Sequence, residues 1–157
     1  MERVNLLYSR TLYGNDKKNM SKEKIVLLHN CDYHNQRPYM SKEEGNGFIY
    51  PCVYLTYKDG SKQVWYSNIN KGHFGTPKVI FSNGSASHPI IDSKGEYGVM
   101  NFAYGIVDDV ENLPHIQKAL LNPEFIKLMS FSWGVSGQNY NPKVIALFRK
   151  DFWKEFI

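Results

Sequence analysis

The chain has 157 residues, which is the length of one domain and long enough to bury a core. Hydrophobic residues make up 42% and charged residues 22%, as in an ordinary globular protein. The longest apolar runs are too short for a membrane span or for the core of a signal peptide, so we expect no membrane partner. The two cysteines, Cys31 and Cys52, do not form a disulfide framework, and we expect reduced thiols in a cytoplasmic protein.

The net charge of +4 is unevenly distributed along the chain. Residues 1–80 contain twelve Lys and Arg against seven Asp and Glu, a net +5, whereas residues 81–157 contain seven against eight, a net −1. A basic first half is expected if it faces phosphates, although a solvated face without a partner gives the same imbalance. Aromatic residues reach 15%; most are expected in a Tyr-rich β core, and the rest can stack against bases.

The first two thirds of the chain are predicted to form short strands. Residues 1–23 are predicted to be a polar N-terminal link and 24–157 a single domain. Residues 30–47 are a long polar loop, and loops of this length are usually functional or mobile. Predicted strands cover residues 24–29, 48–56, 63–67, 78–82 and 89–92, and residues 97–107 form a long strand or a bent pair of strands.

Two local signals refine these strands. The Asp59-Gly60 pair predicts a hairpin turn between the second and third of them. Pro51 predicts either an edge strand or a bulge at that residue, because proline has no N–H to give to a neighbouring strand.

Beyond residue 108 the pattern changes to helix starts. Asn112 is expected to cap a helix that ends at about Leu121, and Asn122-Pro123 and Asn141-Pro142 each place an N-cap before a proline at the first helical position. Asp151 is expected to cap a last short helix. The sequence therefore predicts an α+β fold, with short, mainly antiparallel strands in residues 24–107 followed by two or three short helices in residues 112–156.

No complete catalytic or metal motif is present. Gly45-Asn46-Gly47 precedes a strand instead of leading into a helix, and the chain has no P-loop and no nucleophile elbow. His29, Cys31, His34 and Cys52 are zinc-ligand types, but their spacing does not match a tetrahedral site, so we expect no metal. Asp92-Ser93-Lys94 supplies only a fragment of a nuclease motif. The absence of these local motifs does not exclude a catalytic site built from residues that are far apart in the sequence.

The segment 65–81 concentrates side chains that suit DNA contact: amides and hydroxyls for base edges, and lysines for phosphates. Glycines at 72 and 75 with Pro77 predict an exposed loop between the flanking strands, where contacts are usually mounted. In an alternative interpretation Asn68 and Asn70 only complete turns and His73 packs beneath them. The predicted DNA-binding residues are Tyr66, Ser67, Asn68, Asn70, Lys71, His73, Phe74 and Lys78.

This segment resembles a block in the C-terminal region of adenine-specific DNA methyltransferases of restriction–modification systems. The matching motifs are Tyr66-Ser67-Asn68, Gly72-His73-Phe74-Gly75 and Pro77-Lys78-Val79-Ile80-Phe81, and similar blocks follow in the family's order at residues 89–92, 95–98, 118–129 and 148–156. The resemblance implies a target-recognition domain, with double-stranded DNA as partner.

The chain departs from that family in its catalytic motifs. No two of its seven prolines are adjacent, so it has no Asn/Asp-Pro-Pro-Tyr/Phe motif, and it has no glycine motif for S-adenosylmethionine. The resemblance therefore implies the specificity part without the methyl-transferring part. No cofactor is expected in this chain, because S-adenosylmethionine would bind a separate catalytic domain or subunit, which is the second expected partner. Two alternatives stay open: a protein-interaction module of a restriction–modification complex, and a nuclease whose site is not visible from sequence.

Overall fold

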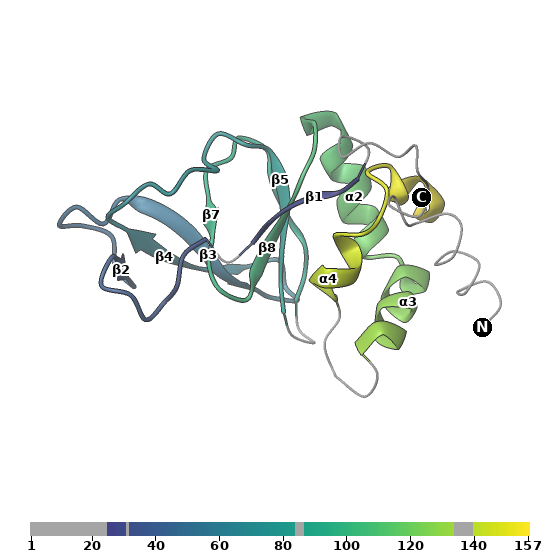
Figure 1. Ribbon diagram of the computed structural model, residues 1–157, viewed down its shortest axis with the longest axis horizontal. Helices are drawn as coiled ribbons and strands as arrows, with labels where there is room; N and C mark the ends of the chain where they lie inside the picture. The colour runs from purple at the N-terminus through teal and green to yellow at the C-terminus, as the bar shows by residue number, and fades with distance from the viewer. Residues whose placement is uncertain (1–24, 31, 84–86, 134–139) are drawn as a thin grey trace.

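The computed structural model describes the backbone of residues 25–30, 32–83, 87–133 and 140–157, and it contains two four-stranded sheets and a group of short helices (Figure 1). The strands are β1 (Leu27–Asn30), β2 (Met40–Ser41), β3 (Tyr50–Thr56), β4 (Lys62–Ser67), β5 (Lys78–Ser82), β6 (Ile90–Asp92), β7 (Gly98–Val99) and β8 (Ala103–Val107). The helices are the 3-10 helix η3 (Val110–Asn112), α2 (Leu113–Leu120), α3 (Pro123–Trp133), α4 (Pro142–Ile145) and the 3-10 helix η4 (Phe152–Phe156). The predicted α+β fold is confirmed; the link predicted for residues 1–23 lies outside the described residues.

The strands form two layers, and the helices form a third. One sheet has the order β1-β8-β5-β6 and the other β2-β4-β3-β7. Figure 1 shows the helices at one end of the molecule, beside the first sheet, with the second sheet at the opposite end. All the pairings are antiparallel except that of β3 with β7, which is parallel. The first sheet is therefore the middle layer.

β5 shows how the middle layer is built, because it is buried on both faces. Val79 and Phe81 belong to the hydrophobic cluster that contains the helices. Ile80 belongs to a separate cluster with Val53 of β3 in the other sheet. This alternation follows from the two-residue period of a strand. Lys78 shares a face with Ile80, so its side chain lies on the side of the second sheet.

The predicted hairpin between β3 and β4 is confirmed. Asp59 Oδ1 accepts the N–H of Ser61 at 2.9 Å, and Gly60 has a φ of 84°. The prediction for Pro51 needs correction, because β3 is an inner strand at Cys52 and Val53, where it pairs with both β4 and β7. At Pro51 only β4 pairs with it, and the register shift that marks a bulge lies further along, around Tyr54.

Residues 97–107 form a bent pair of strands and not one long strand, which is the second of the two structures predicted for them. β7 ends at Val99 and β8 begins at Ala103, and the Ala103 N–H donates to Met100 O at 3.0 Å across the turn. Phe102 lies in this turn with a φ of 74°, which is unusual for a bulky residue. The bend allows one segment to contribute a strand to each sheet.

The helices begin mostly where the sequence predicts. The side-chain oxygens of Asn122 and Asn141 accept backbone N–H groups two residues further on, at 2.8 and 3.1 Å. Asn112 and Asp151 occupy the N-cap positions as predicted, but neither makes a side-chain cap hydrogen bond. The Asn112 amide donates to Asp108 instead. α4 is a single turn, shorter than the segment expected there. Among the described residues no helix has both the length and the apolar character needed to cross a membrane.

The last part of the chain closes the helical layer against the first strand. The Val26 N–H donates to Phe148 O at 3.0 Å, and Ile25 forms an isolated antiparallel bridge with Arg149. The ring of Phe125 contacts the rings of Phe148, Phe152 and Phe156. Residues from both ends of the described chain therefore complete one core.

The turn after β6 supports the segment that precedes β5. Gly95 O accepts the Gly75 N–H at 2.9 Å, and Gly95 has a φ of 66°. A Cβ atom at Gly95 would lie 2.1 Å from the Thr76 backbone nitrogen, far inside van der Waals contact. Only glycine allows the two segments to approach this closely.

We predict that Gly95→Ala destabilises the protein more than Gly60→Ala does. Both glycines have positive φ values, but the space around Gly60 is open, so its substitution costs about 1 kcal/mol for the backbone conformation alone. At Gly95 the overlap with the Thr76 backbone adds about 1–3 kcal/mol. Urea denaturation of the two variants measures the difference, and equal losses of unfolding free energy would contradict the close approach.

Candidate functional site

Residues 68–77 form the loop between β4 and β5, as predicted. Gly72, His73 and Gly75 have φ values of 95°, 71° and 78°, so the backbone turns through the left-handed region three times. Histidine tolerates this region better than most residues that have a side chain. The loop shape is therefore encoded by these three residues.

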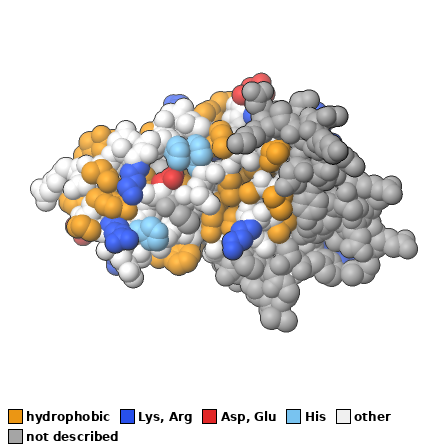
Figure 2. Space-filling view, viewed as in Figure 1, with side chains coloured by type: hydrophobic (Ala, Val, Ile, Leu, Met, Phe, Trp, Pro, Cys, Tyr) orange, Lys and Arg blue, Asp and Glu red, His pale blue; other side chains and the backbone are white. Residues whose placement is uncertain are grey.

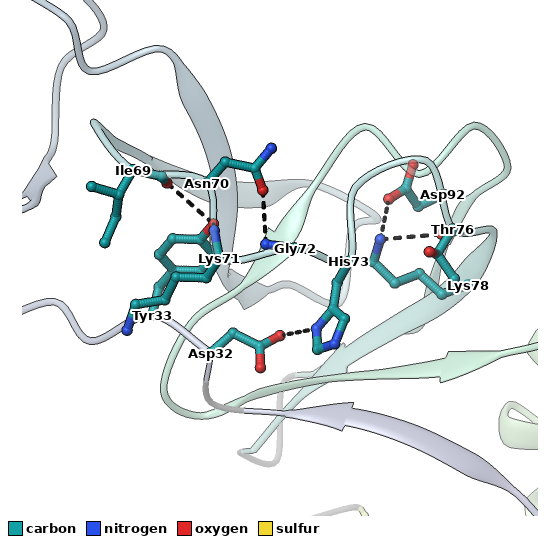
Figure 3. A network of polar contacts seen from close by, with 10 residues as sticks. All are labelled: Asp32, Tyr33, Ile69, Asn70, Lys71, Gly72, His73, Thr76, Lys78 and Asp92. Atoms are coloured by element: carbon teal, nitrogen blue, oxygen red, sulfur yellow. Dashed lines mark hydrogen bonds and ion pairs between the residues drawn. The ribbon is translucent and has the colours of Figure 1, made fainter.

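The loop is attached to the rest of the molecule by Tyr33, which is fully buried. The Tyr33 hydroxyl accepts the Lys71 N–H at 2.7 Å and donates to Ile69 O at 3.3 Å (Figure 3). Burial raises the pKa of Tyr33 to about 12, so the hydroxyl keeps the proton that it donates. The Asn68 N–H also donates to Tyr39 O at 3.0 Å. A loop ordered in this way loses little conformational freedom when it binds a ligand.

Asn68, Asn70 and Lys71 are the exposed members of the predicted set. Asn70 Oδ1 accepts the Gly72 N–H at 2.7 Å, so the turn-completing alternative applies to Asn70. The Asn68 side chain makes no hydrogen bond within the described part of the chain. Its amide is therefore available to a ligand, whereas the Asn70 carbonyl oxygen is already used.

The ammonium group of Lys71 lies over an aromatic surface. Its Nζ is 3.1 Å from the Tyr39 hydroxyl and 4.5 Å from the centre of the Tyr39 ring. The face in Figure 2 shows Lys, Arg and His side chains gathered over the sheets, among hydrophobic groups. The loop thus presents a positive charge at a defined position, which suits a phosphate oxygen.

His73 forms a hydrogen bond with Asp32, a residue outside the predicted contact set. His73 Nδ1 lies 2.6 Å from Asp32 Oδ2, and the two side chains are 38% and 18% exposed (Figure 3). The His73 ring also stacks on His29, with centroids 3.6 Å apart and an interplanar angle of 15°. His73 therefore packs against other residues, as the alternative held, and is still open to solvent.

A carboxylate beside one imidazole nitrogen fixes the orientation of the ring, so that the other nitrogen can form a hydrogen bond with a ligand. The same pair occurs in catalytic triads, where the second nitrogen faces a nucleophile. Within the described ranges, His73 makes no hydrogen bond to a Ser, Thr or Cys side chain. The Asp32–His73 pair thus holds a partly exposed imidazole in a fixed orientation.

His29 differs from His73 in its surroundings. Its Nδ1 is buried and has no hydrogen-bond partner among the residues that the structure describes. Burial lowers the pKa of His29, and the neighbouring His73 lowers it further. The surroundings of His29 therefore disfavour its charged form.

Lys78 is a correction to the predicted contact set. A phosphate contact requires an exposed ammonium group, but the Lys78 side chain is fully buried and its Nζ lies 3.0 Å from Asp92 Oδ2. The Nζ also donates to Thr76 O at 3.3 Å (Figure 3). A Cβ at Gly105 would come within 2.8 Å of the Lys78 stem, so the glycine makes room for it. Lys78 is a structural residue.

The remaining predicted residues are Ser67, Phe74 and Tyr66, and the first two support the loop. Ser67 is buried and its Oγ accepts the Ile69 N–H at 3.1 Å, so Ser67 is also removed from the contact set. Phe74 is half-buried and packs against the rings of Tyr33 and Tyr50. Tyr66 is half-buried in β4 and stays a candidate.

The described residues contain no group of three or more His, Cys, Asp or Glu that could coordinate a metal ion. Cys52 has a free, buried thiol, and burial raises its pKa to about 12. Such a thiol is a poor nucleophile and a poor metal ligand, because both roles require the thiolate. Cys31, the other predicted free thiol, lies outside the described residues.

The sequence did not predict a role for Asp32, Tyr33 or Tyr39. His29 was considered only as a zinc ligand, and that zinc site was not expected to form. Three of these lie in the loop that was predicted over residues 30–47, and the length of that loop was the one available signal. Asp32 is 41 positions from His73, so only the fold brings them together.

Comparison of the chain with protein-family models, with curated proteins and with solved structures gave no match.

We predict that Lys78→Met and Asp92→Asn each destabilise the fold strongly, because each leaves a buried charge unpaired. Lys78→Met should lower the free energy of unfolding by about 3–5 kcal/mol. The double variant should lose less than the sum of the two, since it removes both charges. Denaturation of the four proteins measures the coupling. Additive losses would show that the two charges do not interact.

We predict that His29 makes the protein sensitive to acid. Its pKa is lowered in the folded state, so the unfolded chain binds the proton more tightly once the pH falls below the ordinary histidine value of about 6.5. Stability is thus unaffected above that pH and falls as the pH is lowered through the folded-state pKa. Thermal unfolding at pH 7.5 and 5.5 should show a smaller acid-induced decrease in His29→Asn than in the wild type; an equal decrease would contradict this.

Proposed function

We propose that this chain recognises a DNA sequence as the specificity part of an adenine-specific DNA methyltransferase or restriction–modification enzyme. The observation that carries the proposal is the pre-ordered loop 68–77, which presents Asn68 and Lys71 beside the Asp32–His73 pair. The sequence resemblance supplies the enzyme class, and the geometry supplies a means of contact.

The exposed groups match the two parts of a DNA interface. A carboxamide can form two hydrogen bonds with the edge of adenine, which gives sequence discrimination. Lys71 is a cation suited to phosphate oxygens, which give affinity that does not depend on sequence.

A separate recognition surface is a chemical necessity for an adenine methyltransferase. The target base must leave the helical stack before its amino group can react. Another surface must keep the duplex in register while this happens. In the proposal, this chain supplies that surface and a catalytic partner supplies S-adenosylmethionine and the methyl-transfer chemistry.

The test is a binding assay on duplexes selected from a random library at low salt. We expect Lys71→Ala to weaken binding to all duplexes alike and to reduce the salt slope by roughly one unit. We expect Asn68→Ala to cost about 1–3 kcal/mol on the selected sequence only. Fluorescence anisotropy over a salt series measures both effects.

Lys58→Ala is the matched control, because Lys58 is exposed in the β3–β4 turn, at the other end of β4 from the loop. It should leave the affinity and the salt slope unchanged. If folded Lys71→Ala and Asn68→Ala keep the wild-type affinity, slope and sequence preference, the loop is not the DNA contact. Binding to a methyltransferase or restriction subunit without any duplex binding would favour a protein-interaction module.

A further inference from the structure

A second group of aromatic residues lies on the sheet β2-β4-β3-β7, outside the loop 68–77. The Phe102 ring is 6.2 Å from the Tyr54 ring, and the Tyr54 ring is 5.6 Å from the Trp65 ring. Lys42 Nζ lies 5.4 Å from the centre of the Trp65 ring. These four residues, from four different segments, are called the aromatic row below.

Two backbone irregularities produce the aromatic row. Phe102 has a φ of 74°, a conformation that costs a bulky residue roughly 1–2 kcal/mol. The residue is nevertheless 49% exposed. Tyr54 is the residue at the β3 register shift, and a bulge redirects the side chain that it carries. Strain that exposes an apolar ring does not stabilise the fold, and such outliers cluster at ligand sites.

The row has a rigid base and a polar border. Tyr54 and Trp65 pack on a buried cluster of Tyr33, Met40, Cys52 and Met100. The Asn35 amide donates to the Tyr54 hydroxyl at 3.1 Å, and the Asn35 N–H donates to the Asn101 side-chain oxygen at 3.1 Å. The Asn101 amide also donates to the Asn35 side-chain oxygen at 3.4 Å, so both amides are used within the protein. Phe102 therefore projects from a fixed support, with a lysine at the far end of the row.

This combination has a recognisable ligand class. An exposed ring stacks on any planar heterocycle, and a lysine neutralises phosphate. A paired base inside a duplex does not offer its face to such a ring. An unpaired nucleotide does.

We infer that the aromatic row is a binding site for an unpaired nucleobase in single-stranded or locally opened DNA, with Phe102 as the stacking ring and Lys42 contacting the backbone phosphate. The inference goes beyond the proposed duplex recognition, because it uses other residues and does not require Asn68 or Lys71.

The experiment compares three labelled probes at low salt by fluorescence anisotropy: a twelve-nucleotide oligo(dT), an abasic strand with the same phosphates, and a twelve-base-pair duplex. The wild-type protein should bind oligo(dT) more tightly than the abasic strand. Phe102→Asn should weaken oligo(dT) binding by roughly 5- to 100-fold, to the level of the abasic strand. Its duplex affinity should change by less than about twofold, since the row does not contact paired bases.

Asparagine is chosen because it tolerates the left-handed conformation at position 102, so the variant keeps its fold. Phe102→Trp should retain the preference for oligo(dT), because the larger ring also stacks. Tyr57→Ala is the matched control, because Tyr57 is another exposed aromatic residue, 38% exposed after β3, outside the row. It should bind all three probes as the wild type does.

Equal wild-type binding to oligo(dT) and to the abasic strand would overturn the inference, even if Lys71-dependent duplex binding is intact. So would a folded Phe102→Asn variant that keeps the preference. A Phe102-dependent preference for oligo(dT) supports the inference even if the protein does not bind the duplex, and in that case only the proposed function fails.

Discussion

The buried ion pair between Lys78 and Asp92 is the interaction on which the candidate surface depends. Both charges are removed from water, and their desolvation is offset only if every donor and acceptor finds a partner. Lys78 also donates to Thr76 O, and the Asp92 oxygens accept the N–H groups of Glu96 and Tyr97 at 2.8 and 3.1 Å. The pair therefore joins the end of the loop 68–77 to the turn after β6.

In this arrangement, the residues that support the loop 68–77 are different from the exposed residues that are candidates for ligand contact. Tyr33, Ser67 and Lys78 use their polar atoms on the protein itself, below the surface. Asn68 and Lys71 project from the same loop with their functional groups exposed. Neighbouring residues of similar chemistry thus have opposite roles, and only burial distinguishes them.

The sequence predicted the elements well for local reasons. A β-branched run bounded by turn residues predicted β5, and the Asp59-Gly60 pair predicted the β3–β4 hairpin, because both signals act over a few residues. It failed where the outcome depends on residues far along the chain. Lys78 is buried because Asp92 lies opposite it in the strand register and Gly105 leaves space for its stem, and neither fact is visible from the surrounding residues. Asp32 was missed for the same reason.

The pairing of residues 25 and 26 with 149 and 148 has a consequence for how the chain folds. Contacts between distant positions form slowly, because a long loop must close before they stabilise anything. During synthesis the β3–β4 hairpin can form early, whereas the helical core lacks Phe148, Phe152 and Phe156 until these residues have left the ribosome. The face of the first sheet that packs on this core therefore gains its full cover only after all four of its strands have been made.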